Sequence, residues 1–254
     1  VGPTVLYRGA GEFKASYKEG QQIFPIRQDG IAIALILALF YLVVPYFATQ
    51  YWLQGILIPV LIFSLAAIGL NILTGYAGQL SLGSAAFMAV GAFAAYNFML
   101  RVPGMPILVA FILAGLCAAA VGMVFGLPSL RIKGFYLAVA TLAAQFFIVW
   151  CLTKFPWLSN NSSSGVISTQ KLIIFGHELK TPVEKYLLVL SIVVFLALAA
   201  KNMVRSATGR AWMAVRDMDV AASVIGIRLM PTKLLAFAVS SFYCGVAGAL
   251  YAFC

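Results

Sequence analysis

Long apolar runs alternate with short polar segments along most of this chain. About twenty apolar residues suffice for a helix to cross the roughly 30 Å hydrocarbon core of a bilayer. The pattern therefore predicts an all-α fold, a polytopic transmembrane helical bundle. The seven expected spans lie at about 31–48, 53–74, 84–100, 106–127, 134–152, 186–204 and from 232 onward.

Residues 69–97 interrupt this pattern with TGYAGQLSLG, in which polar side chains alternate with glycines. Lipid cannot hydrogen-bond an irregular backbone, so such an interruption must be covered by protein or line a water-filled cavity. Broken helices of transporters have this appearance in sequence. We predict a broken or re-entrant segment near 75–83 that lines a translocation path; the alternative is a glycine-rich turn that only packs. The predicted lining residues are Asn71, Thr74, Gly75, Tyr76, Gly78, Gln79, Ser81 and Gly83.

Composition supports a membrane protein. Of 254 residues, 63% are hydrophobic and 9% are charged, and the mean hydropathy is +1.01, whereas a soluble domain is about a quarter charged. The formal charge of +10 is spread between the apolar segments and does not form one basic block. We therefore expect no nucleic-acid partner and interpret the basic residues as signals of membrane topology.

The basic residues favour a cytoplasmic N-terminus. With that orientation twelve Lys and Arg lie inside and five outside. Residues 1–30 then form a cytoplasmic extension of the 31–254 permease domain, 153–185 an outer loop and 205–231 a cytoplasmic loop. The first apolar run lacks a small-residue cleavage site, so we expect a retained anchor. The sequence ends at Cys254 inside an apolar run, and we expect further helices beyond it.

The chain lacks the residues of a self-powered transporter or an enzyme. No predicted span contains an ionisable side chain in its interior, although ion-driven carriers usually have one. No phosphate-binding GxxxxGK motif, HExxH or GxSxG occurs. His177 lies alone in a loop and the four cysteines have no metal-like spacing, so we predict neither a metal nor a cofactor. We expect a separate subunit to hydrolyse nucleotide, with a gradient-driven carrier as the alternative.

The basic loop contains GRAWMAVRDMDVAASVIGI at 209–227. At 3.6 residues per turn, this pattern predicts one cytoplasmic helix that ends at Gly226. Arg216 and Asp219 lie at a pairing distance of three, on a ridge with Trp212 and Ser223. The alternative is an amphipathic helix that rests on lipid head groups.

Three blocks together resemble the M-type permease subunit of bacterial branched-chain amino acid ABC importers. They are NILTGYAGQLSLGSAAFMAVGAF at 71–93, GLPSLRIKGFYLAVATL at 126–142, and 209–227 running into KLLAFAVSSFYCGVAGALYA at 233–252. The resemblance implies a multi-pass protein of the bacterial inner membrane. Its implied partners are a second homologous permease, two cytoplasmic ATP-binding subunits and a periplasmic solute-binding protein.

The resemblance also implies that the 205–231 loop docks on the ATPase. Where importers often carry Glu-Ala-Ala and a later Gly, this chain has Val220 in place of the Glu. Ser84 stands where many relatives have His, and NNSSSG replaces a glycine-rich outer stretch. The implied coupling residues are Arg210, Trp212, Arg216, Asp217, Asp219, Ala221, Ala222 and Gly226.

Because the binding protein largely selects the solute in such systems, the pore stretch does not decide the substrate. We expect branched-chain or related amino acids first. Permeases for urea and short amides share the same blocks and are the alternative.

Overall fold

The computed structural model describes residues 27–102, 104–127, 135–158, 173–174, 177–178 and 181–254. Most of the predicted N-terminal extension, and the SNNSSSG stretch of the outer loop, lie outside this part of the chain. Contacts divide the protein into two units, Val1–Thr49 and Gln50–Cys254.

The first unit contains one helical segment. It consists of α2 (Arg27–Ala38), a π-helical stretch η1 (Leu39–Val43) and α3 (Val44–Phe47). Asp29–Phe47 is long and apolar enough to cross a membrane, and none of its residues is buried inside the protein. The predicted helix at 31–48 is therefore confirmed.

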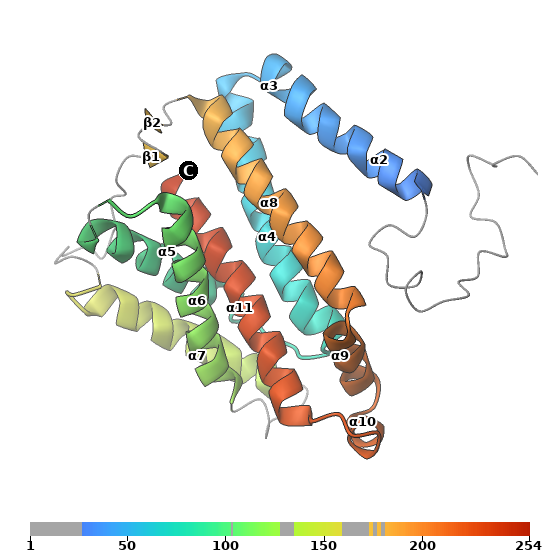
Figure 1. Ribbon diagram of the computed structural model, residues 1–254. Coiled ribbons are helices and arrows are strands. Elements are labelled where there is room, and N and C mark those ends of the chain that lie inside the picture. The colour runs from blue at the N-terminus through green and yellow to red at the C-terminus, as the bar shows by residue number, and fades with distance from the viewer. Residues whose placement is uncertain (1–26, 103, 128–134, 159–172, 175–176, 179–180) are drawn as a thin grey trace, which may run out of the picture. The chain divides into compact units, whose positions relative to one another are not determined.

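The described residues of the second unit are mostly helical and include a short antiparallel pair of strands, β1 (Ile173–Ile174) and β2 (His177–Glu178), in the predicted outer loop (Figure 1). The helices are η2 (Trp52–Leu57), α4 (Ile58–Asn71), η3 (Ile72–Tyr76), α5 (Ser84–Arg101), α6 (Ile107–Gly126), α7 (Phe135–Lys154), α8 (Pro182–Arg205), α9 (Ala207–Asp217), α10 (Asp219–Val224) and α11 (Leu229–Phe253).

Six helices of the described residues are long and apolar enough to cross a membrane, which confirms a polytopic helical bundle. All predicted spans are helical, but α5 is not among those six. The reason is its composition, because α5 is rich in alanine and carries Asn97 and Arg101 in its last two turns. A spanning role for α5 thus rests on its packing and not on its hydropathy.

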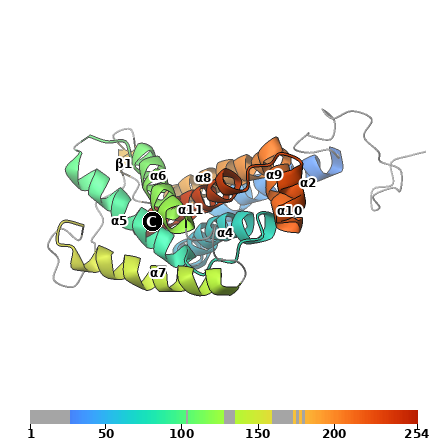
Figure 2. The same cartoon turned by 90° about the horizontal axis from the view of Figure 1, so that it is seen from below.

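Helix α11 forms the centre of the second unit, between α4 on one side and α5 and α6 on the other (Figures 1 and 2). Close approach of these helices depends on small residues. A Cβ on Gly91 would lie 2.0 Å from the Gly245 carbonyl oxygen, and one on Gly122 would lie 1.9 Å from Ser241 Oγ. Neither position admits a larger residue without moving a helix.

Candidate functional site at the helix break

The predicted interruption is present between α4 and α5. The helix that begins with α4 continues through η3 to Tyr76, and the next helix starts at Ser84. Residues 77–83 are not helical. Gly78 has φ +66°, in the left-handed region where a side chain is strained, and the amide of Gln79 donates to the Leu73 carbonyl over 3.0 Å. The glycine therefore lets the chain turn back over the end of the helix.

Residues 79–83 alternate between buried and exposed positions, with the apolar side chains on the exposed side. Gln79, Ser81 and Gly83 are buried, whereas Leu80 and Leu82 are about half exposed. Polar side chains thus point into the protein and the leucines point out. This alternation places three of the eight predicted path residues in the interior.

Helix α7 covers part of the irregular backbone. The Leu82 amide donates to Thr141 Oγ1 over 3.0 Å, and the Gly83 amide donates to Ser81 Oγ over 3.3 Å. Thr141 is itself buried. Protein therefore satisfies part of the irregular backbone, as an interruption at membrane depth requires.

Gln79 is the unusual polar group of the break. Its side chain is 6% exposed, and neither Nε2 nor Oε1 has a hydrogen-bond partner among the described residues. A buried polar atom without a partner costs about 1–3 kcal/mol. The amide is therefore available to a donor or acceptor from outside this part of the chain.

The other predicted path residues are at least partly exposed, and one of them hydrogen-bonds within its own helix. Asn71 and Gly78 are exposed, and Gly75 and Tyr76 are half-buried. Thr74 Oγ1 donates to the Leu70 carbonyl in its own helix over 2.9 Å. The interior polar surface of the break consequently comes from Gln79 and Ser81.

The loop at 209–225 forms two helices and not the single helix predicted. Met218 has an extended backbone, with φ −154° and ψ 104°, and separates α9 from α10. The expected ridge is broken there, and the predicted pairing of Arg216 with Asp219 is wrong. Arg216 Nε instead contacts Asp217 Oδ1 at 2.9 Å, and Lys233 Nζ contacts Asp219 Oδ2 at 3.1 Å.

Arg216 joins α9 to the helix break. Its Nη1 donates to the Gly75 carbonyl over 2.9 Å. A Cβ on Gly78 would lie 2.6 Å from Arg216 Cγ and 3.3 Å from its Cα, so α9 rests directly on the left-handed turn. The two stretches that the sequence singled out are thus in contact, although 141 residues separate these partners.

Both loop helices are also anchored to α11. Trp212 is fully buried in α9, and its Nε1 donates to the Thr232 carbonyl over 3.0 Å. The pairing of Asp219 with Lys233 fixes the start of α10 to the same helix. Movement of α9 and α10 would therefore be transmitted to α11 and to the break.

The remaining predicted coupling residues do not contact the helix break through any hydrogen bond among the described residues. Arg210 donates through Nη1 to the Arg205 carbonyl at the end of α8, away from the break. Ala221 is exposed and Ala222 is buried. Gly226 has φ +89°, and its amide donates to the Ser223 carbonyl over 3.1 Å, which confirms the predicted helix stop.

One feature of α10 was missed from the sequence. Val220, Val224 and Ile225 are 74%, 80% and 72% exposed, and Met218 beside them is 68% exposed. Two large apolar side chains within this helix of six residues are therefore exposed, and one more is exposed at each of its ends. The signal available was Val220 in place of the Glu, because it adds an apolar residue to the exposed side.

Comparison with known proteins identifies relatives. Residues 52–254 match the family model described as branched-chain amino acid transport system / permease component. The chain is 30% identical over 217 residues to the high-affinity branched-chain amino acid transport system permease protein LivM of Escherichia coli, and equally to that of Salmonella typhimurium. Each alignment covers 76% of this chain and 50% of the relative, so the chain spans about half the length of these curated relatives. No solved structure matches the chain.

Proposed function

Because the chain belongs to the family of branched-chain amino acid transport system permease components, we propose that it is the permease subunit of an ATP-driven importer. The solute would be a branched-chain or related apolar amino acid. The partners would be separate ATP-binding subunits, a second homologous permease and a periplasmic solute-binding protein. The family match, the six apolar helices and the resemblance of three sequence blocks support this assignment.

The observation that carries the mechanism is the contact of Arg216 with the break. Arg216 donates to the Gly75 carbonyl over 2.9 Å and packs against Gly78. A displacement of α9 by a partner subunit would therefore change the end of the α4–η3 helix directly. Because packed interfaces switch between discrete arrangements, a small shift here can open or close the adjoining path.

The face that receives the ATPase would be the apolar side of α10. Val220, Val224 and Ile225 are exposed, and α10 is fixed to α11 through Asp219 and Lys233. A short helix with an exposed apolar side suits a groove on another protein. With the N-terminus in the cytoplasm, as the distribution of basic residues favours, this face lies on the side where ATP is available.

The break would form the cytoplasmic end of the translocation path. Gln79 supplies a buried amide with free donor and acceptor capacity, and Ser81 supplies a hydroxyl beside it. Such groups can hydrogen-bond the polar end of a passing amino acid without presenting a fixed charge. A neutral polar surface of this kind permits release as well as binding, which a path requires.

Reconstitution of the permease with its partner subunits in liposomes tests this function. Uptake of radiolabelled leucine should require ATP and the binding protein, and should stop when the ATP-binding subunit is omitted. Uptake of leucine by the permease alone down an ion gradient would instead establish a secondary carrier. ATP-dependent uptake of urea without uptake of leucine would assign the assembly to the amide permeases.

A further inference from the structure

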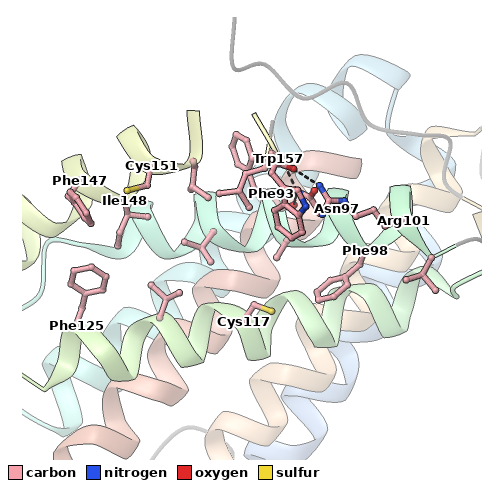
Figure 3. Close-up of a pocket in the computed structure, with 16 residues that line it drawn as sticks. Phe93, Asn97, Phe98, Arg101, Cys117, Phe125, Phe147, Ile148, Cys151 and Trp157 are labelled. Carbon is pink, nitrogen blue, oxygen red and sulfur yellow. Dashed lines mark hydrogen bonds between the residues drawn. The ribbon is translucent and has the colours of Figure 1, made fainter. Parts of the chain in front are cut away.

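Helices α5, α6 and α7 enclose a groove with a volume of about 600 Å³ (Figure 3). Its lining is almost wholly apolar and includes Val90, Phe98, Val121, Phe125 and Phe147. Neither Asp nor Glu is among the described residues that line it. The groove lies apart from the contact between Arg216 and the helix break.

One end of the groove is cationic. The Arg101 guanidinium lies over the Trp157 ring, 3.5 Å from the ring centre, and also donates to the Trp157 carbonyl. Asn97 Nδ2 donates to the carbonyls of Phe93 and Leu158, over 2.8 and 2.9 Å. These bonds tie the turn after α7 to α5. Since a guanidinium has five N–H donors, Arg101 retains donors for an anion.

The opposite end is formed by aromatic side chains. Figure 3 shows Phe125 and Phe147 at one end of the groove and Arg101 and Trp157 at the other. The α5 part of the lining runs from Val90 to Arg101, about 16 Å at 1.5 Å per residue. One leaflet of a bilayer core measures about 15 Å, and Trp and Arg favour the interface at its edge.

From this geometry we infer that the groove is a phospholipid site that holds one acyl chain, with the lipid phosphate on Arg101. The apolar lining matches the chain, the length matches one leaflet, and the cationic end complements the anionic phosphate. A free apolar amino acid fits poorly because the described lining residues offer no carboxylate for its ammonium group. The inference requires only that the helices lie in a membrane and does not depend on the transported solute.

A bound lipid would have a structural consequence at the break. Helix α7 packs against α5 and supplies Thr141, whose hydroxyl accepts from the Leu82 amide. An acyl chain in the groove would fill the space that α5, α6 and α7 share and hold α7 in place. Removal of the lipid should therefore lower the thermal stability of the assembly.

The principal test compares two charge-removing variants of the assembled permease complex, Arg101→Gln and Lys154→Gln. Lys154 is exposed in the last turn of α7 and does not line the groove, so it serves as the matched control. The probe is phosphatidylglycerol, titrated onto delipidated complex in detergent and counted by native mass spectrometry. Loss of one charge-assisted contact should weaken binding about tenfold in Arg101→Gln, with no change in Lys154→Gln. Equal binding by both variants and the parent would overturn the inference.

Two further measurements test the role of the lipid phosphate and the position of the acyl chain separately. Phosphatidylcholine should bind through the same phosphate and lose affinity in the same variant. Val121→Trp leaves Arg101 intact but fills the groove, so it should abolish retention of either lipid. If Val121→Trp binds lipid as the parent does, the acyl chain lies elsewhere and the site is wrong.

A photo-crosslinking residue at Phe125 identifies the occupant directly. Irradiation of the purified complex should add the mass of a phospholipid to the permease. The same residue at Phe195, which is 71% exposed on α8 and outside the groove, should give no lipid adduct after delipidation. A protein-sized adduct at Phe125 would show that a partner chain occupies the groove and would refute the proposal.

Discussion

Replacement of Gly78 by alanine should perturb the contact between α9 and the helix break. Gly78 has φ +66°, and an L-residue in this region costs about 1–2 kcal/mol. The new Cβ would also lie 2.6 Å from Arg216 Cγ, 3.2 Å from its Cβ and 3.3 Å from its Cα. A change of rotamer at Arg216 moves Cγ but not its Cβ or Cα, which also lie close to the new Cβ. Either α9 or the helix break must therefore shift.

Gly104 provides a matched control for this change. It has φ +84°, and a Cβ there would meet nothing within 4 Å. Gly104→Ala therefore carries the conformational strain alone. Overpacking typically adds about 1–3 kcal/mol, so we expect Gly78→Ala to be destabilised by that much more than Gly104→Ala.

The assay is thermal unfolding of the purified assembly together with leucine uptake in liposomes. Gly104→Ala should lose a little stability and keep its uptake. Gly78→Ala should lose more stability and most of its uptake, because the Arg216 contact with Gly75 is displaced. Adding Arg216→Ala to Gly78→Ala removes Cγ, so it should recover part of the stability lost to overpacking but neither the backbone strain nor the uptake. Equal loss of stability in the two single alanine variants would refute the assigned contact.

Substitutions at three further positions test the packing of the helices. Thr141→Val leaves the Leu82 amide without its acceptor and should cost about 1–3 kcal/mol in thermal unfolding; Thr153→Val is the control, since its hydroxyl bonds only to carbonyls of its own helix. Trp212→Phe should cost about 1 kcal/mol through loss of the bond to Thr232, and Trp212→Ala about 3–5 kcal/mol through loss of a buried ring. Gly91→Ala places a Cβ 2.0 Å from the Gly245 carbonyl and should prevent stable assembly, whereas Gly55→Ala, with its nearest neighbour at 3.6 Å, should be tolerated in the same expression assay.

The helical content was predictable because an apolar run of about twenty residues in a bilayer must hydrogen-bond its own backbone, and a helix does this within one segment. The observed ends, such as Trp52–Tyr76 and Leu229–Phe253, lie within a few residues of those expected. The interruption near 75–83 was also predictable, since three glycines and several polar residues in one apolar region disfavour a continuous helix. These features depend on local composition, which a single sequence reports directly.

The partners within the site were not predictable. Helix periodicity through 209–225 paired Arg216 with Asp219, but the extended backbone of Met218 separates them, and Met218 carries no turn signal. The contact of Arg216 with Gly75 joins residues 141 positions apart, a separation at which periodicity gives no information. Likewise, the inward direction of Gln79 and the outward direction of Leu80 follow from packing against neighbouring helices and not from local pattern.

The central claim is that Arg216 transmits movement of the loop helices to the break. The direct measurement is the ratio of leucine transported to ATP hydrolysed by the reconstituted assembly, compared between Arg216→Gln and Asp217→Asn. Asp217→Asn removes an ion pair whose side chains are 41% and 67% exposed and should leave the ratio unchanged. Arg216→Gln also removes the charge-assisted bond to Gly75, so the ratio should fall about tenfold while assembly and hydrolysis persist. An unchanged ratio in Arg216→Gln would contradict the account.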